Sequence, residues 1–171
     1  MRDFWVFGYG SLMWRPGFEY LERERAVLHG LHRKFCIHSW EHRGTREDPG
    51  LVLGLDAGGA CVGLAMKVAG KNREEVIAYL RARELITNVY VECWRNIKLA
   101  RGECVSALVY RADRQHVQYA KGLSLDQQVE IIRYAKGDYG PNIEYAIGTV
   151  EAMKDAGIKD RQLEYIYDQL V

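Results

Sequence analysis

A short segment near the start of the chain combines the residue types that bind small anions. The apolar residues 4–7 are followed by Gly8, Tyr9, Gly10 and Ser11. Glycine allows a sharp turn and the close approach of a ligand, and backbone N–H groups that point the same way attract a carboxylate or a phosphate. Neither a Walker sequence nor the third glycine of a dinucleotide fingerprint follows. The segment is a candidate anion-binding turn, with a purely structural turn as the alternative.

A second candidate is Glu84, which ends a predicted helix with the sequence Arg81-Ala82-Arg83-Glu84. The negative end of the helix dipole lies close to a carboxylate in this position. If the side chain is also partly buried, its pKa rises, and a carboxyl of raised pKa suits proton transfer. Glu84 is therefore a candidate general acid/base, and a helix-end glutamate without a chemical role is the alternative.

Two other segments carry groups that can contact an anion. Arg43 precedes a glycine in a predicted loop, where its guanidinium can bind a carboxylate through two hydrogen bonds or tie down its own loop. Tyr145 follows Gly140-Pro141-Asn142 at the start of a predicted helix, and a helix N-terminus can hold an anion. Capping of that helix by Asn142 is the simpler interpretation.

Four histidines and one cysteine lie within residues 29–42, namely His29, His32, Cys36, His38 and His42. On a strand, His38 and His42 would share a face with Cys36. However, Arg, Lys and Trp interrupt the run, and the spacing matches no zinc motif. We therefore expect no metal site, and histidines that are exposed or hydrogen-bonded.

The elements that must position these residues are mostly strands in the first two thirds of the chain. We predict strands over residues 4–9, 51–55, 61–68, 89–99 and 105–110, and a long strand or hairpin over 27–40. Asp56-Ala57-Gly58-Gly59 predicts a hairpin turn, and residues 43–50 a loop. One helix, residues 71–85 with Asn72 as its N-cap, lies between the strands.

The last third of the chain is predicted to be helical. Ser124 can cap a helix that continues to Lys136, and residues 137–141 end it. Further helices are predicted over residues 142–156 and 160–170. Strands followed by helices favour an α+β fold with a small, mostly antiparallel, barrel-like sheet and flanking helices. The length of 171 residues suits one domain, residues 1–171.

Composition excludes several classes of protein. The chain is 48% hydrophobic and 27% charged, with a net charge of +1, which provides no long-range attraction to nucleic acid or to an anionic membrane. No apolar run approaches the ~20 residues that span a bilayer, and no signal peptide is recognisable. Four cysteines without a Cys-x-x-Cys pair favour free, mostly buried thiols in a reducing compartment. We expect a cytoplasmic protein of unknown oligomeric state.

Taken together, four segments resemble the ChaC family of glutathione-specific γ-glutamylcyclotransferases. They are Val6-Phe7-Gly8-Tyr9-Gly10-Ser11-Leu12-Met13-Trp14, Ser39-Trp40-Glu41-His42-Arg43-Gly44-Thr45, Tyr79-Leu80-Arg81-Ala82-Arg83-Glu84 and Gly140-Pro141-Asn142-Ile143-Glu144-Tyr145. They occur in the family's order and cover nearly the whole chain. The set is fairly specific, although each segment alone is weak.

The resemblance implies a cofactor-free cytosolic enzyme, of small barrel-like mixed fold, that converts glutathione to 5-oxoproline and cysteinylglycine. It implies a substrate-binding loop of Tyr9, Gly10, Ser11 and Leu12. It also implies that Glu84 is catalytic and that Tyr145 contacts the substrate. After Glu84 the chain lacks the glycines of some animal members, which leaves the shape of the pocket rim open.

The implied reaction needs few catalytic groups, because the substrate's own α-amine attacks its γ-carbonyl. Well-oriented intramolecular attack can lower a barrier by ~7–11 kcal/mol. One carboxylate, Glu84, can take a proton from the amine and deliver one to the departing nitrogen. Backbone N–H groups of Gly10, Ser11 and Leu12 can hold the α-carboxylate, and they or the Ser11 hydroxyl can receive the oxyanion.

Other functions remain open from the residues alone. The first is a cyclotransferase for another γ-glutamyl amine or amino acid, which differs only in the leaving group. A second is a non-catalytic module that binds small carboxylates, although a binding module gains nothing from a buried, unpaired glutamate. A structural or interaction protein is the third, and no charge pattern or apolar patch favours it.

Overall fold

The computed structural model describes residues 1–171, and the chain forms two compact units. The first unit comprises Met1–His32 and Leu55–Asp113, and the second comprises Arg33–Gly54 and Arg114–Val171. Two long strands, β2 (Glu22–Ser39) and β3 (Gly50–Val68), contribute residues to both units.

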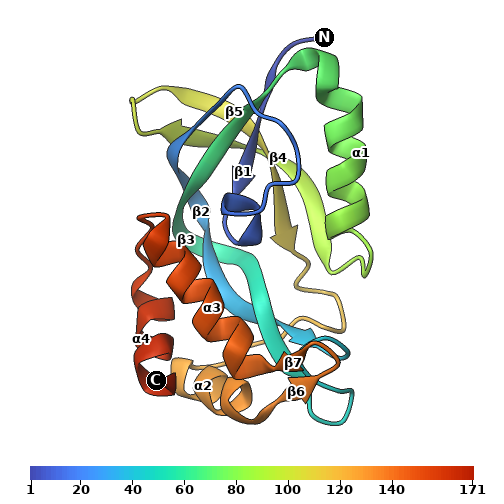
Figure 1. Ribbon diagram of the computed structural model, residues 1–171, viewed down its shortest axis with the longest axis vertical. Coiled ribbons are helices and arrows are strands. Elements are labelled where there is room, and N and C mark those ends of the chain that lie inside the picture. The colour runs from blue at the N-terminus through green and yellow to red at the C-terminus, as the bar shows by residue number, and fades with distance from the viewer. The chain divides into compact units, whose positions relative to one another are not determined.

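Five strands close into a barrel with the order β1-β3-β2-β4-β5. The other three strands are β1 (Phe4–Gly8), β4 (Tyr90–Leu99) and β5 (Cys104–Ala112) (Figure 1). Strand β1 pairs antiparallel with β3 and parallel with β5, and β5 pairs antiparallel with β4. The prediction of a mostly antiparallel, barrel-like α+β fold is confirmed, and the barrel is closed rather than open.

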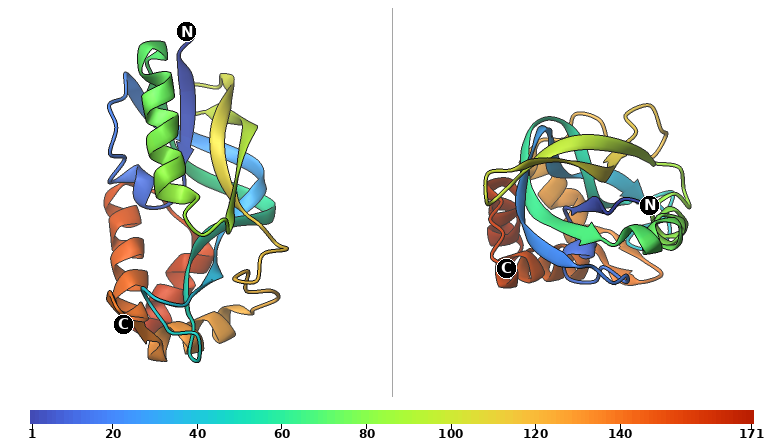
Figure 2. Two further views of the ribbon diagram at one scale, coloured as in Figure 1. Left: turned by 90° about the vertical axis from the view of Figure 1, so that its right-hand side faces the viewer. Right: turned by 90° about the horizontal axis from the view of Figure 1, so that it is seen from above.

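Strand β1 is buried on both of its faces, because alternate side chains belong to different apolar clusters. Trp5 and Phe7 pack in one cluster with residues of β2 to β5. Phe4 and Val6 pack in a second cluster that includes apolar residues of helix α1 (Arg73–Glu84). Since successive side chains of a strand point to opposite faces, β1 separates these two clusters, and α1 lies beside it (Figure 2).

Helix α1 begins close to its predicted start, but the contacts that stabilise its first turn differ from the prediction. A single 3₁₀ turn, η2 (Gly70–Asn72), precedes it, and Asn72 occupies the N-cap position without a side-chain capping bond. The guanidinium carbon of Arg73 instead lies 4.9 Å from the ring centre of Phe4 and 5.3 Å from that of Trp94. These cation–π contacts attach the start of α1 to β1 and β4.

The predicted hairpin at residues 56–59 is wrong, because β3 runs through this segment without reversing. Gly58 and Gly59 have positive φ values of 102° and 63°, which a hairpin turn also requires. In β3 the same two glycines bend one continuous strand, as expected for a bulge. The carbonyl oxygen of Gly58 lies 3.0 Å from Nδ1 of His32 on β2.

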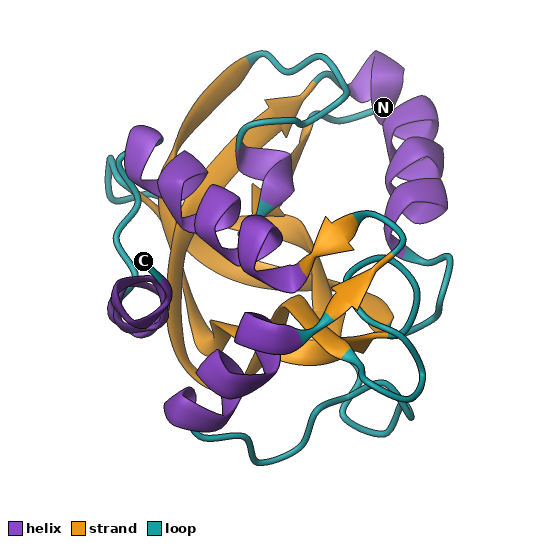
Figure 3. Cartoon of the chain, turned by 60° about the horizontal axis from the view of Figure 1, so that its bottom comes forward, coloured by secondary structure: helices purple, strands orange, loops and turns teal.

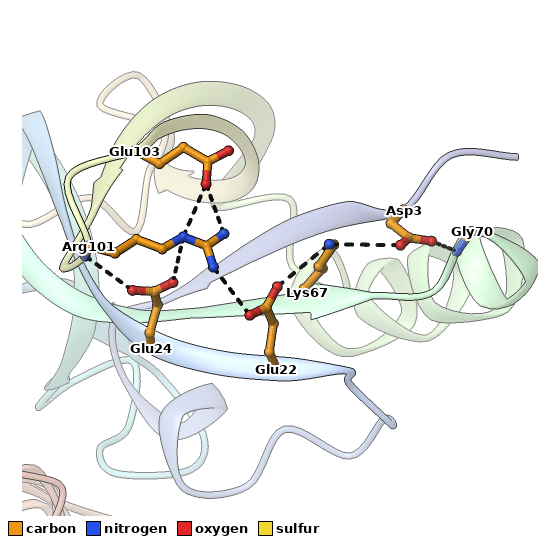
Figure 4. Close-up of polar contacts among 7 residues, drawn as sticks. All are labelled: Asp3, Glu22, Glu24, Lys67, Gly70, Arg101 and Glu103. Atoms are coloured by element: carbon orange, nitrogen blue, oxygen red, sulfur yellow. Dashed lines mark hydrogen bonds and ion pairs between the residues drawn. The ribbon is translucent and has the colours of Figure 1, made fainter.

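Charged side chains of the first unit form an exposed network near the starts of β1 and β2 (Figure 4). The guanidinium of Arg101 pairs with Glu22, Glu24 and Glu103. Lys67 pairs with Glu22 at 3.5 Å and with Asp3 at 4.0 Å. Exposed ion pairs each add only about 0–1 kcal/mol to stability. This surface network therefore contributes little to the stability of the fold.

Three helices of the second unit pack against one another: α2 (Leu125–Tyr134), α3 (Asn142–Asp155) and α4 (Arg161–Leu170). A two-stranded sheet, β6 (Lys136–Gly137) and β7 (Gly140–Pro141), joins α2 to α3 (Figure 3). Ser124 caps α2 through a capping box, as predicted. The helix ends two residues before the predicted Lys136, because that residue already belongs to β6.

The four cysteines form no disulfide, as predicted. Cys36 and Cys61 are buried, Cys93 is half-buried and Cys104 is exposed, so the expectation of burial fails for Cys104. It lies at the start of β5, opposite Lys98, in a part of the hairpin that faces water. No helix has both the length and the apolar character that a membrane span needs.

Candidate active site

The candidate anion-binding loop leaves the barrel at the end of β1. Gly8 ends the strand, and the 3₁₀ turn η1 (Ser11–Met13) follows, closed by a 2.9 Å hydrogen bond from the Met13 N–H to the Gly10 carbonyl. A Cβ on Gly8 would lie 3.2 Å from both Leu12 Cβ and Met66 Cε, so glycine permits this close return. The first N–H groups of a helical turn have no partner within the turn.

Glu84 is the last residue of α1, and its side chain is only 17% exposed. Burial raises the pKa of its carboxyl, and the neighbouring positive charge of Arg83 acts in the opposite direction. The sequence-based expectation of a partly buried carboxyl with a raised pKa is confirmed. Such a group exchanges protons more readily near neutral pH than an exposed glutamate does.

Arg83 connects the loop to this carboxyl. Its Nη2 donates a 2.8 Å hydrogen bond to Oγ of Ser11, and its Nε lies 3.7 Å from Oε1 of Glu84. Leu12 of the loop and Leu80 of α1 also share one apolar cluster. The two segments, separated by about seventy residues, therefore meet in the first unit, as the sequence analysis required.

A buried tyrosine next to this pair was missed by the sequence analysis. The hydroxyl of Tyr110 on β5 donates a 2.8 Å hydrogen bond to Oε1 of Glu92, which lies opposite it on β4. Glu92 in turn accepts hydrogen bonds of 3.0 and 2.9 Å from Nε and Nη2 of Arg81. The only signal in the sequence was a Glu and a Tyr on two adjacent strands, and it has meaning only once their register is known.

The charges around Tyr110 keep its hydroxyl protonated. Burial raises the pKa of Tyr110 well above its usual range, and the hydrogen bond to Glu92 and the charges of Glu92 and Glu84 act in the same direction. The hydrogen bonds from Arg81 lower the pKa of Glu92. Glu84 is thus close enough to affect Tyr110 electrostatically, and a neutral phenol lies in the electrostatic field of the candidate base.

Arg43 lies in the second unit and binds backbone oxygens there. Its Nη1 donates to the carbonyl oxygens of Tyr139 (3.0 Å) and Pro141 (3.3 Å), and its N–H donates to Oγ of Ser39 (3.0 Å). These bonds tie the loop after β2 to the β6–β7 hairpin, which agrees with the loop-tying alternative. Substrate binding by Arg43 stays a prediction.

Tyr145, also in the second unit, lies on the first turn of α3. Its hydroxyl accepts a 3.1 Å hydrogen bond from the N–H of Leu53, and its ring lies edge to face with Phe35. Substrate contact by Tyr145 likewise stays a prediction.

The interpretation of Asn142 as a helix cap is wrong, because Pro141 occupies the N-cap position of α3. The Asn142 side chain is fully buried and makes two hydrogen bonds to the backbone of Leu51 instead, of 2.8 and 2.9 Å.

His42 does not share a strand face with Cys36 and His38, because β2 ends at Ser39 and His42 lies beyond it. The ring of His42 stacks on Tyr139, with centres 4.1 Å apart and planes inclined by 3°. Burial lowers the pKa of His38. No three His, Cys, Asp or Glu side chains are arranged to hold a metal ion.

Comparison with known proteins finds relatives that match most of the chain. The chain is 34% identical over 156 residues to the glutathione-specific γ-glutamylcyclotransferase of Escherichia coli strain K12, covering 91% of this chain and 68% of that protein. It is 31% identical to glutathione-specific γ-glutamylcyclotransferase 1 of Homo sapiens, covering 96% of this chain and 77% of the human protein. A yeast γ-glutamylcyclotransferase specific to glutathione has the same fold, with a TM-score of 0.85 at 21% identity, over 99% of this chain and 96% of the yeast chain.

The family model described as ChaC-like protein matches residues 4–170, which is nearly the entire sequence. That match includes the loop after β1, the end of α1 and the start of α3. This chain therefore belongs to the ChaC-like protein family.

Proposed function

We propose that this protein is a γ-glutamylcyclotransferase that cleaves glutathione to 5-oxoproline and cysteinylglycine, with Glu84 as the proton shuttle. The observation that carries the proposal is a buried carboxyl of raised pKa joined through one arginine to a tight turn that can bind anions. The names of the related proteins support glutathione as the substrate.

The reaction begins with loss of a proton from the substrate's α-ammonium to Glu84, which frees the amine to attack. The nitrogen then bonds to the γ-carbonyl carbon, and the carbonyl oxygen takes up negative charge in the tetrahedral intermediate. Glu84 gives this proton to the cysteine nitrogen and takes a second one from the ring nitrogen, which carries two hydrogens and a positive charge after the attack. Collapse of the intermediate breaks the bond to the cysteine nitrogen, and the second proton passes to the released amine. The carboxylate is regenerated, and no water is consumed.

The loop supplies the groups that orient the γ-glutamyl moiety. We propose that the backbone N–H groups of Gly10, Ser11 and Leu12 bind the α-carboxylate of the substrate. Tyr9, in the same loop, also contacts the substrate. Fixing the amine against the carbonyl in this way lowers the barrier, because both reacting groups are already in one molecule. The Ser11 hydroxyl or a backbone N–H then faces the oxyanion, where one such donor is worth about 3–4 kcal/mol.

Tyr110 has a supporting role in the proposed reaction. Its proton is engaged by Glu92, so its oxygen presents lone pairs to any donor near Glu84. An ammonium group has three N–H donors, and only one proton has to leave before the nitrogen attacks. We assign to Tyr110 the task of accepting a hydrogen bond from the substrate's nitrogen while Glu84 removes the proton.

The direct test is incubation of the purified protein with glutathione, followed by mass spectrometry for 5-oxoproline and cysteinylglycine. A panel of other γ-glutamyl amino acids and amines, assayed in parallel, identifies the preferred leaving group. Tight binding of glutathione without any product would support a binding module and contradict the proposal. We further propose that residues 1–171 act as one cytoplasmic domain without a cofactor.

A further inference from the structure

The guanidinium of Arg83 makes hydrogen bonds to the substrate-binding loop and to the residues that follow it. Its Nη2 donates to Oγ of Ser11 at 2.8 Å, and its Nη1 donates to the carbonyl oxygens of Arg15 at 2.6 Å and Pro16 at 3.3 Å. Nη1 also lies 3.1 Å from the hydroxyl of Tyr79, one turn earlier in α1. The side chain is 23% exposed, so these bonds are only partly open to water.

The same guanidinium also borders the candidate base. Its Nε lies 3.7 Å from Oε1 of Glu84, although consecutive residues of a helix point about 100° apart. The loop contacts draw the two η nitrogens toward residues 11–16 and leave Nε beside the carboxylate. One rigid, planar group therefore contacts both halves of the site.

These contacts determine what the Ser11 hydroxyl can do. A guanidinium can only donate hydrogen bonds, so Oγ of Ser11 must be the acceptor in its bond with Arg83. The hydroxyl keeps its own proton, which is then available to an acceptor on the substrate. The positive charge of Arg83 lies beside this oxygen, so it also stabilises negative charge on the substrate atom that accepts the hydroxyl's hydrogen bond.

We propose that Arg83 is a positioning residue for the cyclotransferase reaction. It holds the Ser11 hydroxyl as a donor toward the reacting carbonyl and holds the Glu84 carboxylate against the same substrate. This inference rests on the proposed function. Arg83 acts on the reaction by positioning Ser11 and Glu84 and does not contact the reacting atoms. The positive charge also keeps the carboxylate ionised at higher proton concentration than burial alone would allow.

Two other arginines of the first unit provide matched controls. Arg73 lies on the same helix and attaches its first turn to Phe4 and Trp94, without a contact to the loop. Arg101 belongs to the exposed network with Glu22, Glu24 and Glu103. R73Q tests for loss of helix anchoring, and R101Q tests for loss of one positive charge.

The experiment measures kcat and KM for glutathione between pH 5 and 10 in wild type, R83Q, R83K, R73Q and R101Q, with the folded fraction of each variant. We expect R83Q to lower kcat by about 100-fold, as a misplaced catalytic group can. Its acidic limb of kcat/KM should also move to higher pH. R83K should return that limb toward its wild-type position, because the charge is restored. It should recover kcat only in part, because one ammonium cannot reach all the partners of a guanidinium.

A double-mutant comparison separates positioning from general destabilisation. If Arg83 acts partly through Ser11, the S11A change should cost less activity in R83Q than in wild type. R73Q should lose stability but keep the wild-type pH profile, and R101Q should keep wild-type kcat.

Three outcomes would overturn the inference. The first is an R83Q enzyme with the kcat and pH profile of R101Q. The second is a rise in KM alone, which would make Arg83 a direct substrate ligand. The third is a loss of activity that follows the folded fraction at every pH. Absence of product from wild type would instead overturn the proposed function itself.

Discussion

The two units differ in how they use their buried polar groups. In the first unit, the largely buried carboxyl of Glu84 has an ion pair of 3.7 Å with Arg83, beyond hydrogen-bonding distance, and burial still raises its pKa. In the second unit, buried Asn142 satisfies both polar groups of Leu51, and buried Arg33 pairs with Asp160 at 3.0 Å. Burial of a charge without full compensation costs stability, and proteins retain such groups where chemistry needs them.

This contrast implies that substitutions in the two units should have different effects. Removal of polar groups around Glu84 should change turnover and its pH dependence more than stability. Removal of the satisfied polar groups in the second unit should change stability more than turnover.

The largest effect is expected for E84Q, which removes the proton acceptor and keeps the shape of the side chain. We expect kcat for 5-oxoproline formation to fall by about 1,000-fold or more, since general acid/base groups contribute about 100- to 10,000-fold. The free energy of unfolding at pH 7 should stay equal or rise, because a buried charge is lost. E103Q, at an exposed carboxylate, is the control. A fully active E84Q enzyme would remove the proposed base.

The pH dependence should sharpen the assignment. Glu84 must be ionised to accept a proton, and burial raises its pKa. The value of kcat/KM should therefore fall as pH falls through that raised pKa. This decline should lie at higher pH than the usual carboxyl range. Stability has the opposite sign: a carboxyl with a raised folded pKa binds more protons when folded, so its stability contribution declines as pH rises through this range. An acidic limb at the pKa of an exposed glutamate would contradict the role of burial.

A smaller effect is expected for Y110F, which removes the hydroxyl next to Glu84 and leaves Glu92 with Arg81. We expect kcat/KM to fall by about 10- to 100-fold through loss of one charge-assisted contact. The matched control is Y165F, since the Tyr165 hydroxyl also donates to a carboxylate, Asp126, at 2.7 Å but lies on α4. Equal activities of the two variants would exclude Tyr110 from the site.

S11A should reduce kcat less than E84Q does, by about 10-fold, because backbone N–H groups of the loop remain. The Ser→Ala control is S124A, which removes the cap of α2 and should cost about 1 kcal/mol of stability without a change in kcat. If S11A retains wild-type activity, the function of the loop rests on its backbone alone.

The smallest change in kcat, less than twofold, is expected for N142A. This variant leaves the buried N–H and C=O of Leu51 unpaired, so the free energy of unfolding should fall by about 2–4 kcal/mol. N142D places a carboxylate at this fully buried position against the carbonyl oxygen of Leu51, so it should lose at least as much. Denaturant unfolding and the 5-oxoproline assay measure the two quantities. A large loss of kcat in fully folded N142A would remove the contrast between the units.

The sequence predicted most elements, because local signals were strong. An apolar run placed β1, strand-forming residue types placed β4 and β5, and Ser124 and Asp160 marked the starts of α2 and α4. It failed at β3, where a Gly-Gly pair is compatible with both a hairpin turn and a bend within one strand. The choice between them depends on pairing with β2, which is a long-range interaction that no local pattern contains.

The candidate site was likewise predictable only in part from the sequence. Residue types and helix position alone predicted that Glu84 is a candidate base and that Gly8 to Leu12 form a tight turn. Only the tertiary structure determined that Arg83 joins them and that Tyr110 lies beside them. Those relations depend on the closure of the barrel and on the register of β4 against β5, where burial changes the pKa of each group and brings distant residues within hydrogen-bonding distance.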